Sequence, residues 1–351
     1  MRKLFLRILE VAVALFLILG LWNYKLVQYG FRQLTGQLNI IWNAKPVEEV
    51  MQDPKLNSEN FKKLKLVEEI RRFAMDSLQL KNSQNYTTYY DQHEKPIMWV
   101  VTGCLPYELK EKEWWFPVLG NVSYKGFFIE RNAIIEESEI RKQGYETNIY
   151  SPSAWSTLGI LKDPIFSGML KRSPGRLAEL IIHELTHATI YLKSSVDFNE
   201  NLATFIGEKG AEVFLKSHFG EQSEEYKRYN GYLADEEIYN EYMMNCSLIL
   251  DSLYHTFSES TPVKEKATKK YKLIANFMLG INNLPLTSPE RYKFDFIKSR
   301  LPNNTEFMSF LRYRKKQDNF NKVFIEIYKN DLRTFITDIV NKSAKGEKLP
   351  F

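Results

Sequence analysis

The chain has 351 residues, of which 44% are hydrophobic and 14% aromatic, and this apolar content is enough for a large core and excludes a mostly disordered protein. Its 48 Lys and Arg residues against 43 Asp and Glu give a net charge of +5 that is spread along the sequence, so no basic stripe points to nucleic acid. The two cysteines, Cys104 and Cys246, are too few for a disulfide framework or a cysteine-ligated zinc site, and the sequence does not show whether they pair.

The N-terminus combines a basic start with an apolar segment. As a helix, residues 4–22 would span about 28 Å, close to the roughly 30 Å of a bilayer core, although Arg7 and Glu10 interrupt its first half. No small-residue cleavage site follows. The pattern predicts a cytoplasmic stub and membrane anchor helix over residues 1–22 and a single-pass protein of the cell membrane, with residues 23–351 in the periplasm or otherwise extracytoplasmic. The alternative is an amphipathic or buried helix of a cytosolic protein.

The remaining chain, residues 23–351, contains no linker, low-complexity tract or repeat, which predicts one globular domain. Apolar spacing predicts a helix over residues 60–80, and short strands are expected at 96–102 and 126–130. From Pro174 onward the pattern is mostly helical. The predicted fold class is therefore α+β and predominantly helical, with a small sheet in the first half and a helical C-terminal part.

The segment LIIHELTHATIYL places two histidines four residues apart in an apolar run. On a helix, His183 and His187 would be only about 40° apart around the axis, so both imidazoles project from one face and Glu184 lies beside it. This H-E-x-x-H spacing is typical of a zinc site in which the glutamate works on the metal-bound water. Ser173 and Pro174 supply a start for the helix. The alternative is a pair of solvated or internally satisfied core histidines.

A third ligand is expected in the following segment, DFNENLATFIGEKGAEVFL. If Asn199 starts a helix there, Glu200 and Gly207 share one face, and small residues on that face allow a close approach to the first helix. Glu200 is therefore the predicted third ligand, and Glu208 is the competing carboxylate. Asp197 or Glu208 could instead accept a hydrogen bond from the far nitrogen of a ligand histidine.

These residues carry a family resemblance. The pieces HELTH and FNENLATFIGEKG resemble the paired motifs of gluzincin-type zinc peptidases, and the chain as a whole resembles a bacterial family described as predicted aminopeptidases. The other matching pieces are QLTGQLNIIWNAKPVEEVM, WWFPVLGNVSYKGFF, YSPSAWSTLGILKDPIFSGML, LAELIIHELTHATIY and INNLPLTSPERY. The resemblance implies a zincin-like metallopeptidase with one Zn²⁺ per chain, bound by His183, His187 and Glu200, and with Glu184 as the catalytic residue.

The sequence thus favours a membrane-anchored zinc peptidase, an aminopeptidase that hydrolyses peptides through a zinc-activated water with Glu184 as general base. Its expected partners are a peptide substrate and, through the N-terminal helix, the membrane, with no nucleic acid. The alternatives are a zinc endopeptidase and a catalytically idle, zinc-braced binding or scaffold protein. Tyr150, Tyr191 and Tyr292 are candidates for stabilising an oxyanion, and the sequence does not choose among them.

Overall fold

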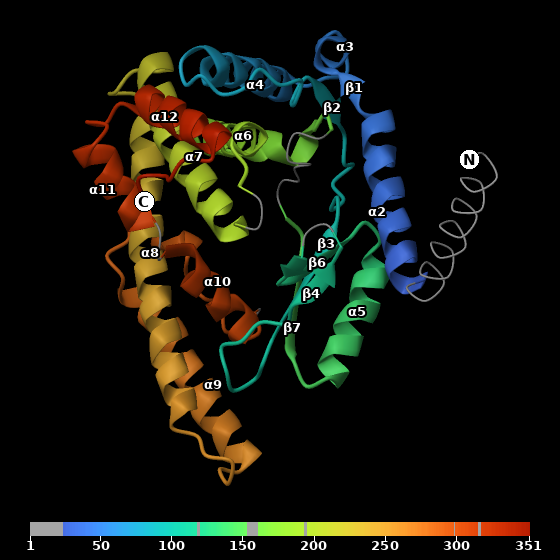
Figure 1. The fold of residues 1–351 in the computed structure, drawn as a ribbon, viewed down its shortest axis with the longest axis vertical. Helices are drawn as coiled ribbons and strands as arrows, with labels where there is room; N and C mark the ends of the chain where they lie inside the picture. The colour runs from blue at the N-terminus through green and yellow to red at the C-terminus, as the bar shows by residue number, and fades with distance from the viewer. Residues whose placement is uncertain (1–23, 118–119, 153–160, 193–194, 298, 315–316) are drawn as a thin grey trace, which may run out of the picture. The chain divides into compact units, whose positions relative to one another are not determined.

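The computed structural model describes residues 24–351 except 118–119, 153–160, 193–194, 298 and 315–316 (Figure 1). The chain divides into two compact units, one that ends at Ala44 and one that comprises Lys45–Phe351. In the first unit the structure describes helix α2, Tyr24–Asn43. All of the candidate site residues lie in the second unit.

The localisation predicted from the sequence is corrected here. The expected anchor, residues 4–22, lies outside the described residues. Within the part of the chain that the structure does describe, no helix is both long enough and apolar enough to cross a bilayer. Helix α2 has 20 residues, but Lys25, Arg32 and several glutamines make it too polar for a hydrocarbon core. This finding contradicts the prediction of a single-pass membrane protein with an extracytoplasmic catalytic domain.

The second unit is α+β and predominantly helical, as predicted. Its strands are β1 (Lys45–Pro46), β2 (Thr88–Tyr90), β3 (Trp99–Cys104), β4 (Trp114–Phe116), β5 (Gly120–Val122), β6 (Tyr124–Phe127), β7 (Glu146–Tyr150) and β8 (Ile165–Phe166). Its α-helices are α3 (Val47–Met51), α4 (Ser58–Asp76), α5 (Glu130–Lys142), α6 (Pro174–Thr189), α7 (Val196–His218), α8 (Glu224–His255), α9 (Val263–Gly280), α10 (Asn304–Arg314), α11 (Gln317–Glu326) and α12 (Leu332–Lys345). The expected helix at 60–80 and the strands near 96–102 and 126–130 correspond to α4, β3 and β6.

The strands form small separate sheets in the first half of the chain. One sheet has the order β6-β3-β7 and is antiparallel throughout, with Val100 of β3 opposite Gly126 on one side and Tyr150 on the other. Helices α5 and α10 both pack against this sheet, and Figure 1 shows them on opposite sides of it. A second sheet has the order β1-β2-β8, and β4 and β5 form a hairpin.

Apolar side chains from the helices of the C-terminal half form the core beside these sheets. Leu250 of α8, Ile274 of α9 and Phe307 of α10 are fully buried in one cluster. The ring of Phe205 on α7 packs against Phe320 of α11, with the ring centroids 5.8 Å apart. This burial supplies the main driving force for holding the helices together.

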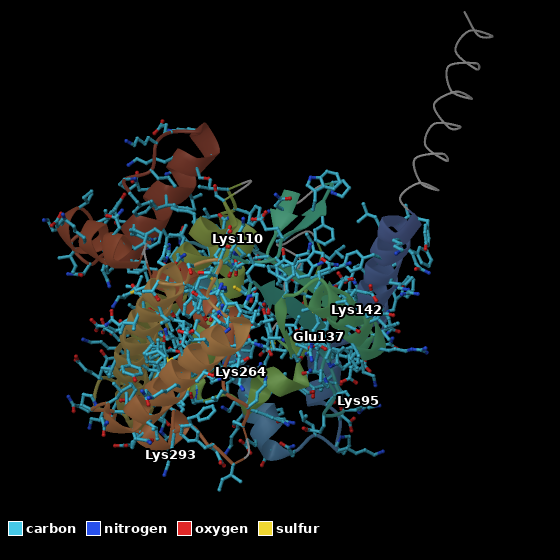
Figure 2. The ribbon with its side chains drawn as sticks, turned by 90° about the horizontal axis from the view of Figure 1, so that it is seen from below. Lys95, Lys110, Glu137, Lys142, Lys264 and Lys293 are labelled. Atoms are coloured by element: carbon cyan, nitrogen blue, oxygen red, sulfur yellow. The ribbon has the colours of Figure 1, made fainter. Side chains whose placement is uncertain are left out.

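Charged side chains lie at the surface on many elements. Figure 2 labels lysines from different parts of the second unit, among them Lys142 of α5 and Lys264 of α9, and both are exposed. Cys104 and Cys246 are buried free thiols that form no disulfide. Burial raises the pKa of Cys104 to about 12, so that thiol stays protonated at neutral pH.

Candidate metal centre

Helix α6 carries the H-E-x-x-H residues and begins where the sequence predicts. Pro174 occupies its first turn after Ser173 at the N-cap, a position where the missing N–H of proline costs nothing. Ile181, Ile182 and Leu185 are each at most 1% exposed. Because these apolar residues bury most of the circumference of the helix, the histidine face is held in a fixed orientation.

Helix α7 begins at Val196, earlier than the start at Asn199 that the sequence suggests. Asn199 has another function: its side chain accepts a hydrogen bond from the Leu192 N–H at 2.9 Å and donates one to the Leu192 carbonyl at 2.8 Å. This reciprocal pair ties the first turn of α7 to the segment that follows α6. Since Glu200 is the next residue, the pair also fixes where Glu200 enters the site.

The two helices approach closely at Gly207. A Cβ placed on Gly207 would lie 2.9 Å from the Glu179 carbonyl oxygen and 3.2 Å from the His183 Cβ. The face of small residues predicted for α7 therefore packs against α6. Glycine is required at position 207 because the backbone of α6 leaves no room for a side chain.

His183, His187 and Glu200 converge at one point. The two Nε2 atoms are 3.1 Å apart, and the Glu200 carboxylate oxygens lie 3.6 Å from His183 Nε2 and 3.5 Å from His187 Nε2. Three ligands on a tetrahedral zinc at about 2.05 Å would be about 3.3 Å from one another. The three side chains could therefore bind a metal ion, and their donor set of two imidazoles and one carboxylate suits zinc.

The electrostatics of the three groups are coupled. Burial alone would lower the pKa of His183, but the hydrogen-bonding Glu200 carboxylate and nearby Glu184 outweigh it, so this pKa is raised. Burial acts to raise the pKa of Glu200, yet the two histidines hold it well below its ordinary range. A cation at this point would take the position that the imidazole protons otherwise occupy.

The far nitrogens of the histidines differ in their surroundings. Thr204 Oγ1 lies 3.5 Å from His183 Nδ1, at the outer limit of a hydrogen bond that would orient this ring. His187 is 4% exposed, and among the described residues its Nδ1 has no hydrogen-bond partner. Asp197, an alternative partner suggested by the sequence, has a side chain outside the described part of the structure.

Glu208, the competing carboxylate, lies away from this point. Burial, with Glu179 and Glu236 nearby, raises the pKa of Glu208 to about 8. Glu179 itself accepts hydrogen bonds from Arg176 and from the Tyr229 hydroxyl. Glu208 thus belongs to a polar cluster between α6, α7 and α8, and the metal-binding geometry is found with Glu200.

Glu184 follows His183 on the same helix and is 8% exposed. No hydrogen bond or ion pair to its carboxylate is formed within the described part of the chain. Glu184 is thus a buried carboxylate that follows a candidate metal ligand in sequence and has no bound donor among the described residues.

A comparison with protein-family models identifies the family. The model described as "Putative aminopeptidase" matches residues 28–348. The chain belongs to this family. The family resemblance inferred from the sequence is therefore confirmed at the level of a putative aminopeptidase, while the assignment to the gluzincin type stays a prediction. No curated protein and no solved structure matches the chain.

Sequence reasoning missed one side chain near Glu184. Tyr86, in the loop that follows α4, is 1% exposed, and burial raises its pKa well above the ordinary value, with the Glu184 carboxylate acting in the same direction. Nothing in the local sequence distinguishes it from the other tyrosines, because the fold brings it to α6. The three tyrosines proposed for the oxyanion stay untested, and Tyr292 packs its ring against Tyr239 at 4.6 Å.

Proposed function

We propose that this chain is a zinc-dependent peptidase of the gluzincin type, with a zincin-like arrangement of α6 and α7, and that it removes residues from the amino end of peptides. The observation that carries the proposal is the convergence of His183, His187 and Glu200 beside Glu184. Membership of the putative aminopeptidase family supports the peptidase class.

In this proposal each residue has a definite role. His183 and His187 present their Nε2 atoms and Glu200 presents its carboxylate to one Zn²⁺ per chain. When bound, zinc would lower the pKa of a water molecule and polarise the peptide carbonyl. The Glu184 carboxylate takes a proton from the attacking water and later delivers it to the nitrogen of the leaving amine.

The exposure of the three ligands supports a catalytic rather than a purely structural metal. The Glu200 side chain is 53% exposed while that of His187 is 4% exposed, so the site is closed on the α6 side and accessible on the Glu200 side. A structural zinc site usually has four protein ligands. Three protein ligands, which is the number that the described residues supply, with one accessible side suit a site that admits a substrate.

The test is to incubate the full chain with zinc and a mixture of free and N-acetylated peptides, and to follow the products by mass spectrometry beside Glu184→Gln. Stepwise loss of N-terminal residues from the free peptides alone, absent in the variant, is the expected result. Internal cuts in both sets would replace the aminopeptidase proposal with an endopeptidase. Zinc binding without any cleavage that depends on Glu184 would overturn the peptidase proposal.

A further inference from the structure

A cavity of about 280 Å³ lies between the last turns of α4 and α7. It is lined from α4 by Glu69, Phe73 and Asp76, and from α7 by Phe214 and His218. Helix α4 ends at Asp76 and helix α7 ends at His218. Two helix C-termini, each with a partial negative charge, are therefore close to the cavity.

Three rings form an apolar wall of the cavity. Phe214 is 2% exposed, and its ring lies nearly parallel to that of His218 with the centroids 5.1 Å apart. The ring of Phe73 meets Phe214 edge-on at 5.4 Å. His218 Nε2 lies 3.5 Å from the Glu69 carboxylate, a contact that helps to fix the His218 ring. Such a wall suits the apolar side chain of a ligand.

Two opposite charges in the lining do not neutralise each other. Arg72, which also lines the cavity, lies one turn before Asp76 on α4, a spacing at which such side chains can pair. They form no ion pair with each other, and neither charged group has a hydrogen bond or ion pair with any other described residue. A guanidinium and a carboxylate are therefore both available to one ligand.

The lining disfavours other classes of ligand. Glu69, Asp76 and His218 do not converge as metal ligands would, because the described residues form such a group only at the candidate metal centre. An anion would meet two carboxylates and two helix C-termini, and a wholly apolar molecule would use neither Arg72 nor Asp76. The volume is just below the roughly 300–1,000 Å³ of sites for drug-sized molecules, so the ligand is small.

We propose that this cavity binds a free α-amino acid with an apolar side chain. The ammonium group of the ligand binds Asp76, its carboxylate binds Arg72, and its side chain packs on Phe73 and Phe214. Phe214 follows Glu200 by 14 residues on α7, about 21 Å along the helix, so this site is separate from the metal centre. A free amino acid is also what the proposed function releases, but binding at the cavity does not depend on that function.

The first measurement is isothermal titration calorimetry of the zinc-loaded full chain with L-phenylalanine. Asp76→Asn and Arg72→Gln should each weaken binding by about 10-fold or more, because each removes a charge-assisted hydrogen bond. Glu59→Gln in the first turn of α4 and Arg131→Gln in α5 remove exposed charges elsewhere and should leave the affinity unchanged. No binding by the wild-type chain, or equal affinities in all the variants, would overturn the inference.

The second measurement tests the ligand and separates the cavity from the metal centre. N-acetyl-L-phenylalanine lacks the ammonium group and L-phenylalanine amide lacks the carboxylate, so each should bind about 10-fold or more weakly than L-phenylalanine. The affinity for L-phenylalanine should be unchanged in Glu200→Gln. Binding that is lost in Glu200→Gln but kept in Arg72→Gln would place the amino acid at the metal centre and reject the inference. Arg72-dependent binding in a chain that cleaves no peptide would support the inference and reject only the proposed function.

Discussion

Glu200 and Glu208 lie about two turns apart on α7. From their positions we expect substitution of Glu200, and not of Glu208, to weaken metal binding. Glu200 is within 3.6 Å of both imidazole nitrogens, whereas Glu208 lies near Glu179 and Glu236. We expect Glu200→Gln to weaken zinc affinity by more than about 100-fold. Loss of a residue that only hydrogen bonds to a metal ligand lowers metal affinity by roughly 10- to 100-fold, and loss of the ligand itself should lower it further. Competition with a chromophoric chelator measures this affinity.

Glu208→Gln is the matched control for this experiment. It makes the same carboxyl-to-amide change on the same helix, and the carboxyl that it replaces is mostly neutral at pH 7 because burial raises its pKa to about 8. Zinc affinity should therefore be close to that of the wild-type chain. Equal losses in the two variants would reject Glu200 as the specific third ligand.

At the scale of single residues, the convergence of the three candidate ligands was predictable where helical periodicity determines it. His183 and His187 converge because four residues make one turn, and Glu200 joins them because small residues such as Gly207 let the next helix come close. Tyr86 was not predictable, since its loop is held by hydrogen bonds from the Lys81 N–H to Thr189 and from the Tyr86 N–H to the Asp163 carbonyl, and both acceptors are remote in sequence.

At the scale of elements, the contact between α6 and α7 determines whether the ligands meet. Gly207→Ala would bring a methyl group to 2.9 Å from the Glu179 carbonyl oxygen, so α7 would have to move away from α6. We expect a loss of about 1–3 kcal/mol in the free energy of unfolding together with weaker zinc binding, because Glu200 moves with the helix. Urea denaturation and zinc titration of the same variant check both effects.

Gly231→Ala provides the control, since Gly231 lies within α8 and its added Cβ would meet nothing within 4 Å. The higher helix propensity of alanine should stabilise that variant by about 0.5–1 kcal/mol. A Gly207→Ala variant that was as stable as Gly231→Ala, with unchanged zinc affinity, would show that the close approach of the helices is not needed.

Helix starts were predictable where a local residue determines them and not elsewhere. Pro174 marks the first turn of α6 correctly. Asn199 also looks like a helix start, because asparagine is a common N-cap residue. Its side chain is hydrogen bonded to the Leu192 backbone instead, and α7 begins earlier. A local capping preference was overridden there by a tertiary contact.

At the scale of the whole molecule, composition and periodicity predicted a mostly helical α+β chain but not how its strands pair. The sheets join segments far apart in sequence, as where Tyr89 of β2 pairs with Ile165 of β8, and strand pairing of this kind has no local signal. The prediction of a single-pass membrane protein was wrong, because no helix in the described part of the chain is long and apolar enough to cross a bilayer.

A buried ion pair connects the sheet β6-β3-β7 to the helical half of the second unit. Lys270 of α9 is 1% exposed, and its Nζ lies 2.6 Å from the carboxylate of Glu146 at the start of β7. The other Glu146 oxygen accepts a hydrogen bond from the Asn304 N–H at the start of α10. Lys270 also donates to the Pro106 carbonyl at 2.8 Å, so each of the two charged groups has more than one polar partner.

Removing one charge of this pair should therefore cost more than removing both. Glu146→Gln leaves the Lys270 ammonium buried without a counter-charge, and we expect it to lower the free energy of unfolding by about 3–5 kcal/mol. Adding Lys270→Met removes that unpaired charge, so the double variant should be more stable than the sum of the single effects predicts. Urea unfolding of the four chains measures the coupling, and additive losses would contradict it. The exposed pair Lys142 and Glu139, at 3.0 Å, should show a coupling of less than about 1 kcal/mol, because solvent screens it.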